Sequence, residues 1–431
     1  MRTWSLRYVL LKQLIKWSAR AYYRRIEVSG AENIPFDKPV IFAPPHQNAM
    51  MDGVVIITSQ SLQPYILTRA DVFNKPTVAK MLKAIRFIPI YRKRDNVDHR
   101  ANNNPIFEFC AEKLKGLGAL LIFPEADMHM KKRLRPVRKG LARIAFKAEA
   151  ENNFELDVKV IPVGLDFSYY SRARSDVMVS FGKPLSIKDY QKIYEEHESK
   201  AIRVFTEDLA AKIHERMIHI KSDEDYELMI FMCKMLYDKK NLKHDIFTAQ
   251  QKVVKVEQLK ADKPQKYKQL MLLLSEYQNL LQQNNAKDWQ VKTPLKSISN
   301  CLIEYFILLG LTPFWLWGEI NNFFPNRIPF MVIPKLVGPQ FKSSGIFLLS
   351  FFLFIIFYTL QTLTAYWLSG SPLFALMYFF TLAGSGFFAV KFREYWNRNT
   401  KNYQFASKTK KQPKILENLK NLRKEIMEVL G

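Results

Sequence analysis

Two long apolar segments near the end of the chain limit its fold more than any other feature. Residues 345–368 and 372–390 contain no charged side chain. A helix needs about 20 consecutive apolar residues to cross the hydrocarbon core of a bilayer, and helices of soluble proteins rarely stay uncharged for so long. The pattern predicts an α-helical membrane hairpin at about 345–368 and 372–390, with a buried hairpin inside a soluble core as the alternative.

Basic residues around the hairpin predict its orientation. The short link at 369–371 has no Lys or Arg, whereas the outer flanks carry Lys335, Lys342, Lys391, Arg393, Arg398 and Lys401. Lys and Arg accumulate in cytoplasmic loops, so both ends of the hairpin are expected in the cytoplasm. A third apolar stretch at 302–318 is interrupted by Glu304, Gly310 and Pro313. Because an odd number of crossings would separate the N-terminal part from the tail, a re-entrant or interfacial segment is favoured there over a true span.

The net charge and the cysteines narrow the class of protein. The chain has 431 residues and a formal net charge of +25, which indicates a polyanionic partner: nucleic acid, anionic lipid headgroups or phosphorylated substrates. Its three cysteines, Cys110, Cys233 and Cys301, are too few and too scattered for a disulfide framework or a thiolate metal site. They are typical of a protein in a reducing compartment.

Residues 1–25 have the pattern of an amphipathic helix. Apolar side chains recur at helical spacing, at Leu6, Val9, Leu10, Leu14 and Trp17. Basic side chains interrupt them and no small-residue cleavage site follows, so a cleavable signal peptide is not expected; the basic residues are Lys12, Lys16 and Arg20. The helix either lies on an anionic lipid surface or packs on the protein as an ordinary surface helix.

Short β-rich runs alternate with helical ones across residues 26–221. The expected strands are Val40–Ala43, Tyr65–Thr68, Phe87–Tyr91, Ala119–Phe123, Val158–Phe167 and Val177–Phe181. Alternation of this kind predicts an α/β domain, a sheet flanked by helices. Ligands of such sheets gather where strands end and helices begin.

Three further regions follow this domain. Residues 222–295 are polar and rich in Lys and Gln, which predicts a helical insert whose apolar stripe packs on a neighbouring helix; the stripe is Leu270, Leu273, Leu274, Tyr277 and Leu281. Residues 296–395 hold the membrane-associated segments. Residues 396–431 are expected to form a basic cytoplasmic tail, with a polar linker at 400–412 and a short amphipathic helix at 415–430.

A histidine and a carboxylate follow the first expected strand, in the run Pro45-His46-Gln47-Asn48-Ala49-Met50-Met51-Asp52. An imidazole whose other nitrogen is held by a carboxylate is suited to remove a hydroxyl proton near neutral pH. Residues six apart lie roughly 120° apart around a regular helix. His46 and Asp52 can therefore meet only if His46 precedes the helix or the first turn is distorted.

Two charged groups follow later strands. Arg92, at the end of Phe87-Ile88-Pro89-Ile90-Tyr91-Arg92, is placed either to bind a phosphate or to end a solvated strand before the basic pair Lys93-Arg94. Glu125 follows Phe123-Pro124 and precedes a basic cluster: Lys131, Lys132, Arg133, Arg135, Arg138 and Lys139. Gly140 opens a helix over 141–150 whose first amides offer donors to an anion. Taken alone the cluster would suit nucleic acid equally well; beside a membrane anchor and an imidazole base, a phosphorylated lipid precursor is favoured.

The order of these motifs resembles the glycerolipid acyltransferase family, which acylates glycerol-3-phosphate or lysophosphatidate. The resemblance covers about residues 28–185, and includes Val160-Ile161-Pro162-Val163-Gly164 and Phe181-Gly182-Lys183-Pro184-Leu185. It implies that His46 is the base and Asp52 its orienter. It further implies that Arg92 binds phosphate, that Glu125 binds the acceptor, and that Pro162 belongs to a motif serving the acyl chain or the substrate pocket.

The chain departs from the family pattern at two places. Five residues separate His46 from Asp52, where the family usually has four, and a one-residue bulge or a shared role for Asn48 would accommodate the extra one. This variant resembles a bacterial branch related to fungal-type glycerol-phosphate acyltransferases. Ala126-Asp127 follows Glu125 where the family commonly has Gly-Thr, which changes the turn near the substrate.

These observations predict a membrane-bound O-acyltransferase that moves a fatty acyl group from acyl-CoA or acyl carrier protein to glycerol-3-phosphate or lysophosphatidate in phospholipid synthesis. The expected substrate-binding residues are Asn48, Arg92, Glu125, Arg135, Lys139, Gly140 and Pro162. We expect a cytoplasmic catalytic domain on a multi-pass protein of the bacterial inner membrane, in contact with phospholipid, with no metal, no bound cofactor and no nucleic acid. The alternatives are an acyltransferase for another lysolipid, and a non-catalytic basic scaffold that binds anionic lipid or nucleic acid.

Overall fold

A computed structural model describes residues 5–92, 95, 98–237 and 242–431. The basic pair at 93–94 and the first residues of the expected N-terminal helix, 1–4, lie outside the described residues. The chain divides into two compact units. The first comprises Met1–Ile220, Asp238–Gln250 and Gly338–Ser344, and the second Lys221–Tyr237, Gln251–Val337 and Gly345–Gly431.

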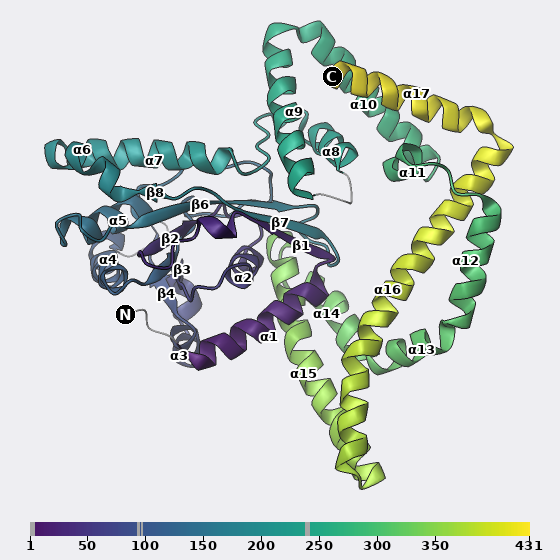
Figure 1. Cartoon of the computed structure of the whole chain (residues 1–431), viewed down its shortest axis with the longest axis horizontal. Helices are drawn as coiled ribbons and strands as arrows, with labels where there is room; N and C mark the ends of the chain where they lie inside the picture. The colour runs from purple at the N-terminus through teal and green to yellow at the C-terminus, as the bar shows by residue number, and fades with distance from the viewer. Residues whose placement is uncertain (1–4, 93–94, 96–97, 238–241) are drawn as a thin grey trace. The chain divides into compact units, whose positions relative to one another are not determined.

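The first unit is built on an eight-stranded mixed sheet (Figure 1). Its strands are β1 (Arg25–Ser29), β2 (Val40–Ala43), β3 (Tyr65–Arg69), β4 (Phe87–Ile90), β5 (Ala119–Leu121), β6 (Lys159–Phe167), β7 (Asp176–Phe181) and β8 (Leu185–Ser186). The order across the sheet is β1-β7-β6-β2-β5-β3-β4, and β8 pairs with β6. β6 runs antiparallel to β7 and β8, and the other pairs are parallel.

The six strands expected from the sequence are all present, and the prediction of a sheet flanked by helices is confirmed. β2, β6 and β7 are almost wholly buried, so they appear in the sequence as continuous apolar runs. β1 and β8 were not predicted. β1 reads Arg-Ile-Glu-Val-Ser at an edge of the sheet, where its charged side chains are only partly buried and break up the apolar pattern, and β8 has only two residues.

Helices cover both faces of this sheet. They are α1 (Leu6–Tyr22), α2 (Met50–Thr58), α3 (Pro76–Ala84), α4 (His99–Lys115), α5 (Gly140–Ala150), α6 (Gln191–Glu196) and α7 (Glu198–His214). On one face, Leu114 of α4, Ile144 of α5 and Phe205 of α7 pack in a single core with Ile41 and Leu120 of the sheet. α2 lies on the side of the sheet opposite α7, and α1 packs against α2 (Figure 1).

The later helices are α8 (Tyr226–Leu236), α9 (Leu242–Asp262), α10 (Pro264–Gln283), α11 (Asp288–Lys292), α12 (Ile298–Gly310), α13 (Thr312–Asn321), α14 (Phe323–Leu336), α15 (Lys342–Ser369), α16 (Pro372–Lys411) and α17 (Pro413–Leu430). The region expected to be a helical insert is therefore helical. In α10 the residues Leu270, Leu274, Tyr277 and Leu281 are buried, and this helix packs against α8 and α17.

Two of these helices are long and apolar enough to cross a membrane. They are α15, with the short turn before it, and α16. α12 and α13 form a third apolar segment that bends by 57° at Leu311, as a broken span or a re-entrant loop does. The prediction of a polar linker at 400–412 is wrong, because α16 continues without a break to Lys411. No Gly or Pro occurs between Gly386 and Pro413, so nothing interrupts the backbone hydrogen bonds there.

A buried ion pair next to the sheet gives a stability prediction. The Lys132 ammonium contacts the Asp166 carboxylate and donates to the Phe167 carbonyl at 3.2 Å, and both charged side chains are about 5% exposed or less. Removing one partner leaves a buried charge, so Lys132→Ala should lower the free energy of unfolding of the first unit by about 3 kcal/mol or more. Hydrogen exchange of the β6 amides in the full chain measures this loss.

Arg203→Ala is the matched control, because it removes a cation from the exposed pair that Arg203 forms with Glu207 at 3.3 Å. Exposed pairs contribute about 1 kcal/mol at most, so β6 exchange should hardly change. Equal effects of the two substitutions would contradict a stabilising role for the buried pair.

Candidate active site

The loop between β2 and α2 brings His46 and Asp52 into direct contact. His46 Nδ1 lies 2.9 Å from Asp52 Oδ2. His46 precedes the helix, and Asp52 lies in its first turn. Ala49, between them, has φ 46° and ψ −129°, a conformation that residues with a Cβ rarely adopt. The backbone distortion at Ala49 thus accommodates the fifth intervening residue.

The Asp52 carboxylate holds the loop as well as the imidazole. Its Oδ2 also accepts the backbone N–H groups of Gln47 at 2.8 Å and Asn48 at 2.7 Å, and Asp52 is fully buried. Since Oδ2 is an acceptor, Nδ1 of His46 donates, and Nε2 keeps its lone pair. No described residue bonds Nε2, and the His46 side chain is 23% exposed. The pair is therefore arranged so that Nε2 can accept a proton.

Glu125 fixes the His46 loop from the neighbouring strand. Its Oε1 accepts the backbone N–H of His46 at 2.7 Å, and its Oε2 accepts that of Arg135 at 2.9 Å. Glu125 is 2% exposed. Burial raises the pKa of this carboxyl to about 7, although the two N–H donors act to lower it. Both carboxylate oxygens are thus engaged with backbone, which makes Glu125 a positioning residue in this structure.

The turn after Glu125 tolerates the departure from the family pattern. Ala126 has φ 59°, the left-handed region that favours the glycine usual at this position. Asp127 Oδ2 lies 3.2 Å from Nη1 of Arg135. The His129 N–H donates to the His46 carbonyl at 3.2 Å, so the two loops are joined by a second backbone contact.

The basic cluster is divided between structural and exposed side chains. Lys132 pairs with Asp166, and Arg133 Nε donates to the Ile220 carbonyl at 2.7 Å. Lys139 is exposed directly before α5, which begins at Gly140. Arg138 and Lys139 are thus exposed cations of this region, and Arg135, which pairs with Asp127, is partly exposed.

Arg92 lies at the end of β4 and is already paired. Its Nη2 is 2.8 Å from Asp95 Oδ1 and 4.0 Å from Asp71 Oδ2, and its backbone N–H donates to Asp95 Oδ2 at 2.8 Å. The guanidinium is 17% exposed. An anionic ligand at Arg92 would have to share or replace these carboxylates.

Pro162 is a buried residue of the sheet. In β6 it pairs with Ala43 at the carboxyl end of β2, three residues before His46. Its carbonyl accepts the Gly182 N–H at 2.8 Å. A Cβ on Gly182 would lie 2.7 Å from Cγ of Pro162, so the glycine is needed for this close approach. Within the part of the chain that the structure describes, no hydrogen bond joins Pro162 to the His46–Asp52 pair.

Several contacts at the site were not predicted from the sequence. The Phe123 ring stacks on the His46 ring with 4.2 Å between centroids. The Tyr170 hydroxyl donates to Oε1 of the buried Gln47 at 3.2 Å, and Met128 Sδ accepts the Ala49 N–H. Phe123 directly precedes the Pro124-Glu125 motif, so its position in the sequence could have marked it as a residue of the site. Nothing in the sequence pattern marks Tyr170 or Met128.

Comparison with known proteins identifies the class of this domain. Residues 25–166 match the family model described as Acyltransferase. These residues include the His46–Asp52 pair, Arg92, Glu125 and Pro162. This segment is therefore an acyltransferase domain.

Three curated yeast proteins match a part of the chain. An uncharacterised acyltransferase of Schizosaccharomyces pombe is 25% identical over 122 residues, 27% of this chain and 18% of its own length. Glycerol-3-phosphate O-acyltransferases 2 and 1 of Saccharomyces cerevisiae are 26% and 28% identical, over 24% and 22% of this chain. The matched parts are 14% and 12% of those two proteins, so the matches concern a small part of each relative.

A solved structure shows a weaker likeness. The 1-acyl-sn-glycerophosphate acyltransferase PlsC of Thermotoga maritima is 20% identical, and the match covers 48% of this chain and 81% of that one. The TM-score is 0.33, and at this value the likeness supports no conclusion about fold or function.

The raised pKa of Glu125 predicts a pH-dependent stability difference. The ordinary pKa is 4.5 and the folded value is about 7, so between these values the unfolded chain releases a proton that the folded chain retains. Glu125→Gln cannot ionise and serves as the reference. The free energy of unfolding of the wild type, relative to this variant, should therefore fall as pH rises from 4.5 to 7 and should stay constant above pH 7. Thermal denaturation at stepped pH measures it, with exposed Glu155→Gln as control. A difference that does not vary with pH would contradict the shift.

Proposed function

We propose that the chain is a membrane-bound O-acyltransferase that transfers a fatty acyl group from a thioester donor to glycerol-3-phosphate. The observation that carries this proposal is the His46–Asp52 contact at 2.9 Å, which leaves Nε2 open within an acyltransferase domain. A hydroxyl nucleophile needs such a base within hydrogen-bond reach.

In the proposed reaction, Nε2 of His46 takes the proton of the acceptor hydroxyl as its oxygen attacks the thioester carbonyl. Asp52 stabilises the resulting imidazolium through Nδ1. The new C–O bond forms, the C–S bond of the tetrahedral intermediate breaks, and the thiolate leaves with the proton returned from Nε2. Glu125 keeps His46 in place through the backbone bond at 2.7 Å.

The acceptor phosphate is assigned to the cations around this loop. Arg92, Arg135 and Lys139 are the proposed ligands, with the amides at the start of α5 after Gly140 as further donors. The phosphate would compete with Asp95 for Arg92. Asn48 and Pro162 are retained as proposed substrate residues because they adjoin the catalytic loop, the former by a backbone bond to Asp52 and the latter by its pairing with Ala43.

The names of the relatives favour one acceptor. Two of the three yeast proteins are glycerol-3-phosphate O-acyltransferases, which supports glycerol-3-phosphate over lysophosphatidate. The proposed donors are acyl-CoA and acyl carrier protein. The two apolar helices α15 and α16 support membrane anchoring, and the basic flanks support a cytoplasmic catalytic domain. The proposed location is a bacterial inner membrane.

Acyl transfer by the purified full chain in detergent tests the proposal directly. Labelled acyl-CoA and acyl carrier protein are offered in parallel with glycerol-3-phosphate and lysophosphatidate. His46→Ala removes the base and should lower kcat by about 10²- to 10⁴-fold. His129→Ala, on the adjoining loop, is the matched control and should retain activity within about tenfold. Product formed only from lysophosphatidate would reassign the acceptor, and lipid binding without His46-dependent turnover would favour a scaffold.

Arg92 gives a separate prediction on substrate binding. Arg92→Lys keeps the charge but loses the bidentate donors, so the KM for glycerol-3-phosphate should rise about tenfold with little change in kcat. Asp95→Asn removes the competing carboxylate and should lower that KM. Steady-state kinetics with varied acceptor concentration measure both. An unchanged KM in both variants would exclude Arg92 from the phosphate site.

A further inference from the structure

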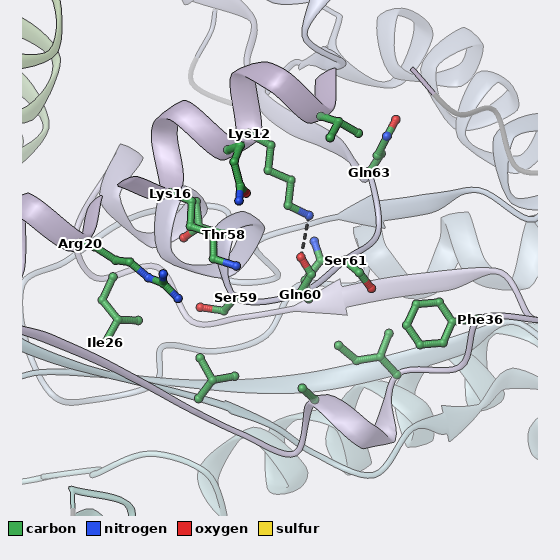
Figure 2. Close-up of a pocket in the computed structure, with 15 residues that line it drawn as sticks. Lys12, Lys16, Arg20, Ile26, Phe36, Thr58, Ser59, Gln60, Ser61 and Gln63 are labelled. Atoms are coloured by element: carbon green, nitrogen blue, oxygen red, sulfur yellow. Dashed lines mark hydrogen bonds between the residues drawn. The ribbon is translucent and has the colours of Figure 1, made fainter. Parts of the chain in front are cut away.

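A cavity lies in the first unit, at the end of α2 remote from His46. It has a volume of about 500 Å³ and lies between α1, the last residues of α2 with the loop after it, and β1 with its following loop (Figure 2). α2 begins beside His46 and has nine residues, which gives it a length of about 13 Å. The proposed acyltransferase site and this cavity are therefore at opposite ends of the same helix.

Three cations of α1 line this cavity. Lys12, Lys16 and Arg20 recur every fourth residue and extend from one side of the helix towards Ser59 and Gln60 (Figure 2). Lys12 Nζ donates to the carbonyls of Gln60 at 2.6 Å and Leu62 at 2.9 Å.

No described carboxylate lies within ion-pair distance of Lys12, Lys16 or Arg20. Burial and the neighbouring charge of Lys16 lower the pKa of Lys12 to about 8. A bound anion would relieve that repulsion.

One residue of the cavity lining carries a buried amide without a partner. Gln60 lines the cavity and is 7% exposed, and within the described part of the chain neither Oε1 nor Nε2 has a hydrogen-bond partner. Buried amides are nearly always bonded, so an unbonded one next to three cations that lack a carboxylate partner indicates a ligand with polar oxygens. The hydroxyl groups of Ser59 and Ser61 also line the cavity.

One part of the cavity wall and the neighbouring face of α1 are apolar. Gln13, Thr58 and Gln63 add polar groups to the lining, and its apolar part is Val9, Ile26, Val28, Ala31, Ile34 and Phe36.

On α1 itself, Leu6, Leu10, Leu14 and Trp17 are exposed by 45% to 67%. Successive residues of a helix are about 100° apart, so this apolar stripe adjoins the face of α1 on which Gln13 and Arg20 line the cavity. A ligand with a phosphate and an acyl chain can thus place the phosphate among the cations and the chain along the stripe.

We propose that this cavity binds the phosphate of an anionic phospholipid headgroup, at a site separate from the His46–Asp52 pair. The apolar wall and the exposed stripe favour a lipid over free phosphate, because free phosphate gains nothing from apolar surface. The site is independent of acyl transfer, and its occupancy can be measured with no acyl donor present.

Lipid binding by the delipidated full chain in neutral detergent tests this proposal. Dioctanoyl phosphatidylglycerol, dioctanoyl phosphatidylcholine and inorganic phosphate are titrated separately, with native mass spectrometry as the readout. Phosphatidylglycerol should bind at least tenfold more tightly than either of the others. The double variant Lys16→Gln/Arg20→Gln should weaken its binding at least tenfold, since each cation contributes a charge-assisted hydrogen bond.

Two further variants separate the cavity from general charge. Lys188→Gln/Lys192→Gln removes the same charge from exposed positions outside the cavity and should leave the affinity unchanged. Ser61→Trp keeps every cation but fills the cavity, and should weaken binding to a similar extent as the double variant. Unchanged binding in the cavity variants, or equal loss in the exposed control, would overturn the proposal. Inorganic phosphate binding as tightly as the lipid would overturn the lipid assignment.

Discussion

A single buried oxygen organises the candidate active site. Asp52 Oδ2 accepts the imidazole of His46 and two backbone N–H groups, and Asp52 has no solvent exposure. Hydrogen bonds to an ionised carboxylate are roughly twice as strong as neutral ones, and here three converge on one atom. They close the loop that carries His46, fix the imidazole tautomer and stabilise the strained conformation of Ala49. The geometry of the proposed base therefore depends on one carboxylate more than on any packing contact.

The sheet supplies the second level of organisation. β2 and β5 are parallel neighbours, so the loops after them leave the same edge of the sheet. Glu125 then joins the two loops, because its two oxygens accept backbone N–H groups of His46 and Arg135. Residues that are 79 positions apart in the sequence are joined by this side chain, and the His129 N–H bond to the His46 carbonyl adds a second connection.

The sequence predicted the parts of the fold whose signal is local. β2 was expected at its observed bounds because its apolar run is continuous, and His46 and Asp52 were paired by residue type. β1 and the helical continuation of α16 were missed, since charged or polar side chains there obscure the underlying structure. The partners of Glu125 and Arg92 depend on which loops meet in space. No spacing along the chain encodes that, so side-chain roles were less predictable than strands.

The length of α16 has a mechanical consequence. Its 40 residues give a rod of about 60 Å, roughly twice the thickness of a bilayer core. Where the apolar first part crosses a membrane, the Lys-rich second part continues as the same rod, with no hinge between them. A thinner bilayer would tilt the span, and because the helix is rigid, its far end would move further than the part within the bilayer. In such a span, bilayer thickness would set the position of the Lys-rich second part of α16.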